Sequence, residues 1–286
     1  MMKFVVRALR RARRKYIPDT SAILPPLRRA YAFLLAHSTA LEERGIPIDI
    51  GGYGYFRLHP KLAVGTYNFE EWGTAHNAGF SQWIEACRGK KAVFDIGAHI
   101  GLYALPASKV IVPQGRLYAF EPAQVNRELL KRHIEYNRIS NIEVVPDLVG
   151  DERKQDVEFF ETESAHGMNT IAQESVAHKN IAHPFRKVLR KQIRLDDFCH
   201  ERGIVPEVIK IDVEGGELKV IQGARKVFVQ SHPLIFLSVH PSHLQHLGSS
   251  AEALYSVILE LGYTAFNTKG NKVNELRKEE YMLRYD

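Results

Sequence analysis

The sequence predicts an α/β fold built around a mainly parallel sheet, and two features lead to this prediction. From about Ser81 onward, short apolar runs alternate with amphipathic stretches, and strands that alternate with helices form right-handed β-α-β crossovers. Runs such as "LIFLSV" and "EVIKI" are almost continuously apolar, which is typical of parallel strands buried on both faces. The chain has 286 residues, 45% of them hydrophobic, which is enough for one sizeable α/β core.

The expected elements follow one another in a regular order. We expect strands at 91–97, 115–122, 141–150, 156–161, 190–194, 207–216, 232–241 and 263–267. We expect helices at 101–111, 123–139, 216–230 and 249–262, and one that begins at Leu195, because their apolar residues recur at helical spacing. Pro106 lies late in the first helix or kinks it, and Pro122 ends the second strand.

Residues 1–75 are expected to form a helical and aromatic extension. "MMKFVVRALRRARRKY" spaces apolar residues at helical intervals among arginines, which indicates a basic amphipathic helix. A second helix is expected after Pro26, ending at Gly45. The stretch 52–73, rich in glycine and aromatic residues, predicts short strands or a loop.

The main domain is expected to span residues 76–286. Within it, the segment 162–190 is polar, rich in histidine and without a clear period. We therefore expect a loop or insertion there, near the mouth of the functional site.

The positive charge is concentrated in the extension. Residues 1–30 hold nine Lys or Arg and one acid, Asp19, so they carry a net +8 while the remaining residues carry −2. The main domain therefore lacks the basic face that is typical of nucleic-acid enzymes. The basic helix, residues 1–15, could lie on an anionic membrane, serve as a solubilising tail or contact RNA, and these alternatives stay open.

No segment has the pattern of a membrane span or a signal peptide. No run approaches the roughly 20 apolar residues that a span needs, and arginines interrupt the apolar stretch near the N-terminus. Cys87 and Cys199 match no metal-binding spacing, which favours two reduced thiols. We expect a cytoplasmic protein, either in solution or peripheral on the inner face of the membrane.

Polar residues lie at the carboxyl ends of the expected strands, where open parallel sheets bind their ligands. They are Asp95, Gly97, His99 and Gly101 after the first strand, Glu121 after the second, Asp147 after the third, Asp212 and Glu214 after "VIKI", and His240 after "LIFLSV". Because these strand ends share one edge of the sheet, we expect a single polar pocket.

The turn after the first strand reads D-x-G-x-x-x-G, which differs from the dinucleotide fingerprint G-x-G-x-x-G. Asp95 stands where the first glycine would be, and its carboxylate disfavours a pyrophosphate and suits a cationic ammonium group. Gly97 would let a ligand approach the backbone, and Gly101 would let the following helix begin close by. His99 lies in this turn, where it would either contact the cofactor or only fill space.

The acids after the next two strands extend the same pattern. Glu121 is placed to accept hydrogen bonds from both hydroxyls of a ribose, and Asp147 is placed to accept one from the amino group of adenine. Ammonium, ribose and adenine without phosphate describe S-adenosylmethionine, which is therefore the expected cofactor.

Several motifs between roughly residues 80 and 245 resemble the FkbM family of class I S-adenosylmethionine-dependent methyltransferases. They are "VFDIGAHIGLYAL", "LYAFEP", "IRLDDF", "VIKIDVEGGELKVIQGA" and "PLIFLSVHP", in the family's order. The resemblance implies a Rossmann-like methyltransferase fold, with a seven-stranded, mainly parallel sheet and helices on both faces. It also implies O-methylation, often of sugar hydroxyls, with Asp95, Gly97 and Glu121 holding the cofactor and Asp212 and Glu214 lining the site.

Two positions depart from the family's pattern. Ser238 stands where the family usually has an acid in the strand, which weakens any role for that acid. Pro146 and Asp147 stand where Asn or a small residue is common, which puts the adenine contact in question.

Methyl transfer from a sulfonium needs in-line positioning and a base, because a sugar hydroxyl is too weak an acid to ionise alone. His240 is the first candidate base, and Asp212 or Glu214 could orient it or the acceptor. The structural alternatives are a cap or turn histidine before Pro241 for His240, a helix N-cap for Asp212 and a first-turn position for Glu214.

No metal is expected. Asp212 and Glu214 could hold Mg²⁺, but we expect these two side chains at the strand end to point apart. The expected acceptor is a hydroxyl of a sugar, glycan or glycolipid. The alternatives are another acceptor class, RNA or a small-molecule natural product, and a non-catalytic scaffold that binds the cofactor.

Overall fold

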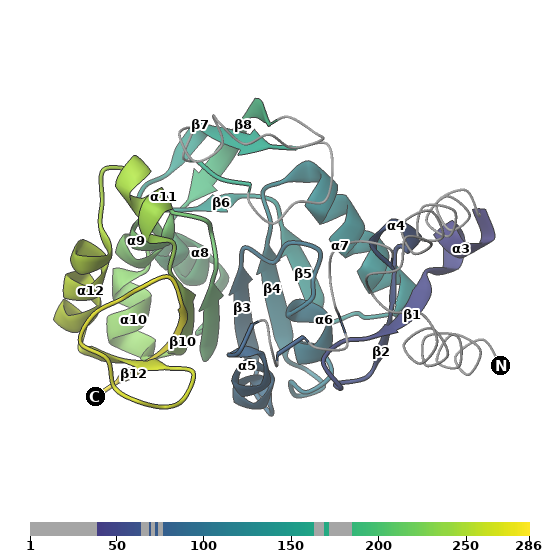
Figure 1. Ribbon diagram of the computed structural model, residues 1–286, viewed down its shortest axis with the longest axis horizontal. Coiled ribbons are helices and arrows are strands. Elements are labelled where there is room, and N and C mark those ends of the chain that lie inside the picture. The colour runs from purple at the N-terminus through teal and green to yellow at the C-terminus, as the bar shows by residue number, and fades with distance from the viewer. Residues whose placement is uncertain (1–38, 64–68, 70–71, 74–76, 163–168, 172–184) are drawn as a thin grey trace, which may run out of the picture. The chain divides into compact units, whose positions relative to one another are not determined.

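The computed structural model describes residues 39–63, 69, 72–73, 77–162, 169–171 and 185–286 (Figure 1). Its internal contacts divide the chain into two compact units, residues 1–70 and 71–286, a few residues before the boundary expected at residue 75. The predicted basic amphipathic helix and most of the helix predicted after Pro26 lie outside the described residues.

The described part of the first unit contains two short helices and a hairpin. Helix α3 (Thr39–Arg44) ends at Gly45, where a φ of 65° stops the helix, as predicted. Strands β1 (Ile46–Asp49) and β2 (Tyr55–Leu58) pair antiparallel, and helix α4 (Pro60–Ala63) follows. The stretch predicted as short strands or a loop thus contains both a strand and a helical turn.

The second unit is built on a seven-stranded sheet in the order β11-β12-β10-β9-β3-β4-β5. Its strands are β3 (Ala92–Ile96), β4 (Arg116–Phe120), β5 (Ile142–Val145), β9 (Val208–Ile211), β10 (Leu234–Ser238), β11 (Tyr263–Asn267) and β12 (Glu280–Tyr285). Only β12 pairs antiparallel with its neighbours, β10 and β11. The predicted seven-stranded, mainly parallel sheet is confirmed, and β12 is a strand that the sequence does not predict.

Helices cover both faces of this sheet, as expected. Helices α8 (Leu195–Arg202), α9 (Glu217–Gln222), α10 (Arg225–Ser231), α11 (Pro241–His246) and α12 (Ala251–Glu260) contribute to one hydrophobic core together with Phe94, Ile96, Ile209 and Ile211 of the sheet. On the other face lie α5 (Phe80–Cys87), α6 (Ala104–Ala107) and α7 (Gln124–Tyr136). There, the ring of Trp83 in α5 packs edge-on against Phe236 of β10, with centroids 5.6 Å apart. Because strand side chains alternate between faces, Asp95 points away from the core that holds Phe94 and Ile96.

The expected third strand, 141–150, is broken in the structure. It forms β5 and then β6 (Leu148–Val149), with Pro146 between them, because proline has no backbone N–H for the ladder. Strand β6 belongs to a separate three-stranded sheet with β7 (Lys154–Glu161) and β8 (Arg186–Ile193), which lie together at the top of the view in Figure 1.

The prediction that a loop extends to residue 190 is therefore wrong, because β8 already begins at Arg186 and pairs antiparallel with β7. The charged residues of this strand alternate between more and less exposed positions, and they hid its period of two in the sequence. Much of the remaining segment, 163–168 and 172–184, lies outside the described residues. Helix α6 is also shorter than the predicted helix 101–111 and contains Pro106 in its only turn.

Candidate active site

An open cavity of about 640 Å³ lies at the carboxyl ends of β3, β4 and β9, and residues of β6, β7 and β8 also line it. Six of the predicted site residues line it, namely Gly97, His99, Glu121, Asp147, Asp212 and Glu214. Asp95, Gly101 and His240 are not among its lining residues. The cavity thus brings six of the nine predicted residues together, and the other three are not part of its lining.

Gly97 brings three strands together at the floor of this cavity. Its φ is 87°, and a Cβ atom built on it would lie 1.9 Å from the carbonyl oxygen of Asp212. The N–H groups of Gly97 and Ala98 both donate to the carbonyl of Phe120 at the end of β4. The glycine is thus required by the approach of the protein's own backbone, in addition to any approach of a ligand.

Glu121 holds the turn after β3 in place. Its two carboxylate oxygens accept hydrogen bonds from the N–H of His99, 2.7 Å, and from the N–H of Ala123, 2.9 Å. His99 adopts a positive φ of 51° here, so this N–H points at the carboxylate. Burial raises the pKa of Glu121 to about 7, although the hydrogen bonds from Ala123 and His99 oppose the shift.

Asp95 is fully buried next to the cavity, with 0% of its surface exposed. Neither of its oxygens has a hydrogen-bond partner among the residues that the structure describes. Burial raises the pKa of Asp95 to about 6, and the nearby positive charge of Lys210, directly beside it on β9, limits this rise. A carboxylate buried without a partner is costly unless a cation or a ligand donor compensates it.

Lys210 is the cation that connects Asp95 with the cavity wall. It is 4% exposed, its Nζ donates to Asp212 Oδ2 at 2.9 Å, and it lies 4.4 Å above the ring of Tyr103. Burial opposes ionisation of Asp212, but Lys210 outweighs this effect and holds the pKa of that carboxyl below its usual range. Sequence reasoning missed Lys210, although it stands in the same "KIDVEG" block as Asp212.

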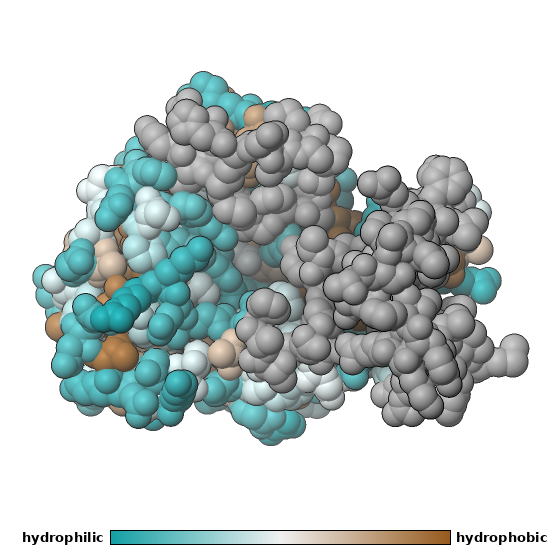
Figure 2. All heavy atoms as spheres, in the orientation of Figure 1, coloured by the Kyte–Doolittle hydropathy of each residue, from teal (hydrophilic) through white to brown (hydrophobic). Residues whose placement is uncertain are grey.

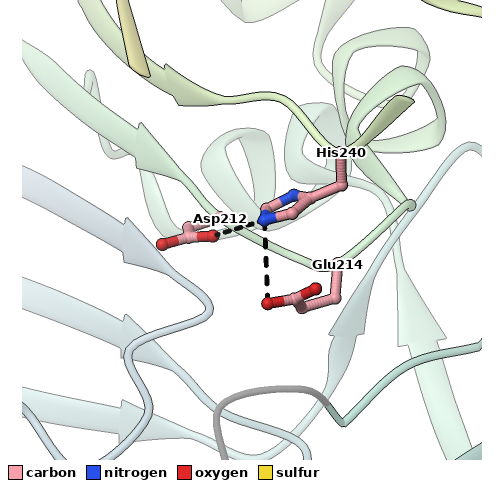
Figure 3. Close-up of side chains that lie close together, drawn as sticks. All are labelled: Asp212, Glu214 and His240. Atoms are coloured by element: carbon pink, nitrogen blue, oxygen red, sulfur yellow. Dashed lines mark ion pairs between the residues drawn. The ribbon is translucent and has the colours of Figure 1, made fainter. Parts of the chain in front are cut away.

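His240, Asp212 and Glu214 meet at the wall of the cavity (Figure 3). The Nε2 atom of His240 lies 3.8 Å from Asp212 Oδ1 and 3.6 Å from Glu214 Oε1. The prediction that Asp212 and Glu214 point apart is therefore wrong. Strand β9 ends at Ile211, and Glu214 has a φ of 51°, which turns its side chain back toward His240.

The structure bears on the structural alternatives in two ways: Asp212 and Glu214 do not cap helix α9, whereas His240 does lie at a cap position before Pro241. The N-cap of α9 is Gly216, and its first turn contains Glu217, so neither Asp212 nor Glu214 caps that helix. His240 occupies the N-cap position of α11 before Pro241, but its side chain makes no capping hydrogen bond.

Two further residues, both missed in the sequence, support this cluster from behind. His240 Nδ1 donates to Oε1 of Glu217 at 2.6 Å, and Glu217 is 0% exposed. His243 Nδ1 lies 3.1 Å from Oε2 of Glu214. Burial disfavours charge on His240, but Glu217, Glu214 and Asp212 outweigh it and raise the pKa of the imidazole to about 9. An imidazole that is already protonated cannot accept the proton of a hydroxyl, so this pKa argues against the predicted role of His240 as a base near pH 7.

Asp147 and Glu280 are two further acids near the site. Asp147 lines the cavity and pairs with Lys191, with Nζ and Oδ2 3.5 Å apart. Glu280 of β12 lies directly opposite Ser238 of β10 and accepts hydrogen bonds from the hydroxyl of Tyr103 and the N–H of Gly79. A neighbouring strand thus places a carboxylate beside the serine that departs from the family's pattern.

The strand order and the cavity together define a protein of the class I methyltransferase fold, in which ligands bind at the carboxyl ends of the central strands. The sequence model of the methyltransferase FkbM domain matches residues 95–265, more than half of the chain. The chain therefore belongs to the FkbM methyltransferase family, which confirms the resemblance seen in its motifs.

Individual relatives are more distant. Methyltransferase 1 of Beauveria bassiana (strain ARSEF 2860) is 26% identical over 143 residues, which cover 46% of this chain and 57% of that protein. The solved structure of methyltransferase FkbM from Methylobacillus flagellatus KT is 20% identical with a TM-score of 0.42, covering 69% of this chain and 44% of the other. A precorrin-6y C5,15-methyltransferase from Geobacter metallireducens GS-15 is 16% identical with a TM-score of 0.41, covering 73% and 86%. The chain thus spans little more than half the length of the curated relative.

Proposed function

We propose that this protein is an S-adenosylmethionine-dependent O-methyltransferase that acts on a hydroxyl of a sugar, glycan or glycolipid. The observation that carries the proposal is the charge of the cavity. Its described lining includes the acids Glu121, Asp147, Asp212 and Glu214 but no Lys or Arg. Such a lining disfavours a pyrophosphate and suits a cationic nucleoside that carries an ammonium and a sulfonium group.

The cavity residues divide into two groups under this proposal. Glu121 and Asp147 would accept hydrogen bonds from the ribose hydroxyls and the adenine amino group, while Asp95 would compensate the ammonium from behind the wall. Asp212, Glu214 and His240 would face the acceptor hydroxyl. The sulfonium needs little further activation, so these side chains would align the acceptor hydroxyl, and the carboxylates of Asp212 and Glu214 would accept its proton in place of the protonated His240.

Mass spectrometry of glycans and lipid-linked sugars incubated with the full chain and S-adenosylmethionine tests this function. A gain of one methyl group on a sugar hydroxyl supports it, and a Glu121→Ala variant should lower this gain through weaker cofactor binding. Methylation of RNA or of a non-carbohydrate small molecule instead would assign another acceptor class. Cofactor binding without transfer to any of these acceptors would indicate a non-catalytic relative.

The raised pKa of Glu121 predicts that cofactor affinity increases as the pH rises through about 7. Only the ionised carboxylate is a pure acceptor for the two ribose hydroxyls, and hydrogen bonds to a charged acceptor are stronger by about 1 kcal/mol, or roughly fivefold in affinity. The same shift lowers the stability of the ligand-free protein from pH 4.5 to about 7, because the folded state keeps a proton that the unfolded state has released.

Isothermal titration with S-adenosylhomocysteine between pH 5.5 and 8.5 measures this dependence. The product is suitable because it lacks the reactive sulfonium yet keeps the ribose. Glu121→Gln should bind more weakly at pH 8 and lose the rise near pH 7. An unchanged rise in this variant would show that another group is responsible.

We also propose that residues 1–15 attach the protein to the inner face of an anionic membrane. Their seven Lys and Arg would each contribute about 1 kcal/mol near such a surface. None of the described helices is long and apolar enough to span a bilayer, and in the view of Figure 2 the described residues present mainly hydrophilic side chains.

Deletion of residues 1–15 should therefore abolish sedimentation with anionic vesicles while cofactor binding persists. Vesicles of neutral lipid are the control and should not sediment either protein. Equal sedimentation of the full and the shortened chain with anionic vesicles would refute the attachment, and retention on RNA would assign the segment to that partner.

A further inference from the structure

We propose that Asp212 Oδ1, Glu214 Oε1 and His240 Nε2 form a binding site for one divalent metal ion at the wall of the active-site cavity. The three residues come from two neighbouring strand ends, after β9 and after β10, and converge in Figure 3. The site itself depends only on their geometry, while its role in catalysis rests on the function proposed above.

The three atoms have the spacing of a preformed site. His240 Nε2 lies 3.8 Å from Asp212 Oδ1 and 3.6 Å from Glu214 Oε1, and all three atoms lie within 4.8 Å of one another. An ion bonded to each at about 2.1 Å needs its ligand atoms roughly 3 to 4 Å apart. Small side-chain adjustments would therefore close the site around an ion.

Hydrogen bonds hold the second polar atom of His240 and of Asp212, while the contact of Glu214 with His243 is close but lacks hydrogen-bond geometry. His240 Nδ1 donates to the buried Glu217 at 2.6 Å, and Asp212 Oδ2 accepts from Lys210 at 2.9 Å. Oε2 of Glu214 lies 3.1 Å from Nδ1 of His243. Metal ligands in proteins are oriented by such outer contacts, and a carboxylate behind a ligating histidine is the commonest of them.

These outer contacts distinguish the site from an ordinary acidic cluster. The Nδ1–H of His240 is committed to Glu217, so Nε2 is the ring atom that faces the two carboxylate oxygens, and an ion bound there would take the place of its proton. Three acceptors then face one another, and a cation at their centre satisfies all three. Two carboxylates with one imidazole and no thiolate favour Mn²⁺ or Mg²⁺.

The ion would replace a side-chain base in the proposed reaction. Asp212 and Glu214 line the cavity, so the remaining coordination positions of the ion would open toward the acceptor. An acceptor hydroxyl bound to the ion becomes a stronger acid and releases its proton to water in the cavity. Its oxygen then forms a bond to the methyl carbon while the carbon–sulfur bond breaks, and the sulfonium becomes a neutral thioether.

Titration of the full chain with Mn²⁺, followed by electron paramagnetic resonance without cofactor or acceptor, tests the site. The chain should bind one equivalent, and both Glu214→Gln and His240→Gln should weaken binding at least tenfold. Glu217→Gln, which leaves all three proposed ligands in place and alters the contact behind His240, should weaken it less than either. Asp147→Asn is the matched control, because Asp147 lines the same cavity outside the cluster and its variant should keep the Mn²⁺ affinity.

Two results would overturn the site. One is a folded wild-type chain that binds no Mn²⁺ at about 1 mM, and the other is an affinity unchanged in both ligand variants. The result of this metal-binding test can be distinguished from the result of the methyl-transfer test of the proposed function. Methyl transfer that continues in excess chelator would contradict a catalytic role for the ion and support the transferase function. Mn²⁺ binding without any methyl transfer would support the metal site and contradict the proposed reaction.

Discussion

Gly97→Ala should destabilise the protein by about 4 kcal/mol or more and abolish cofactor binding. The added Cβ would lie 1.9 Å from the carbonyl oxygen of Asp212, and a φ of 87° is strained for alanine. Backbone atoms cannot move aside as a flexible side chain does, so β3 and the segment after β9 would have to separate. Because Asp212 lines the cavity and begins the cluster with Glu214 and His240, this separation would also distort the site.

Gly203→Ala is the matched control for this variant. Gly203 also has a positive φ, 62°, but a Cβ there would meet no atom within 4 Å, so the change should cost only about 1 kcal/mol. Chemical denaturation of both variants, with calorimetric titration of S-adenosylhomocysteine, compares them. Equal denaturation midpoints for the two variants would show that the contact with Asp212 does not constrain the fold.

Lys210→Met should destabilise the protein by about 3 to 5 kcal/mol, because it removes the cation between two carboxylates while both stay in place. Asp95 is fully buried beside Lys210, and Asp212 accepts the hydrogen bond from its Nζ. Methionine keeps an apolar stem of similar length, but it cannot balance either charge or place a cation over the ring of Tyr103. Lys226→Met, at an exposed position of α10, should change the stability by less than about 0.5 kcal/mol.

The double variant Asp95→Asn with Lys210→Met tests the physical cause. If the loss comes from uncompensated charge, removing the charge of Asp95 should recover part of the stability, because neighbouring groups are not additive. Denaturation in guanidinium chloride measures all the variants under the same conditions. A double variant that is less stable than Lys210→Met alone would attribute the loss to packing instead of charge.

The sequence was most informative where a short motif marks the beginning or the end of an element. The turn from Asp95 to Gly101, the end of α3 at Gly45 and the starts of α7 and α8 follow from nearby residues, since proline, glycine and apolar spacing act within a few positions. Predictions failed where partners are distant. Strand β8 and strand β12 carry many polar residues, and what makes them strands is pairing with β7 and β10.

The site shows the same division. The glycines and acids at the strand ends could be selected from the residues alone, because parallel strands deliver their carboxyl ends to one edge of a sheet. The contacts that give those acids their properties could not, since they join residues from separate elements. Glu217 reaches His240 across 23 positions, and Tyr103 reaches Glu280 across 177.

The amino-acid sequence alone was enough to establish the α/β class, the family and the acidic edge of the sheet, because each depends on periodicity and on short motifs. The folded chain was needed to show that Asp95 lies behind the cavity wall, that Lys210 connects it to Asp212, and that Glu214 turns back toward His240. The physical reason is that charge balance and coordination depend on distances of a few ångströms between elements, and these distances are set by the packing of the sheet and its helices.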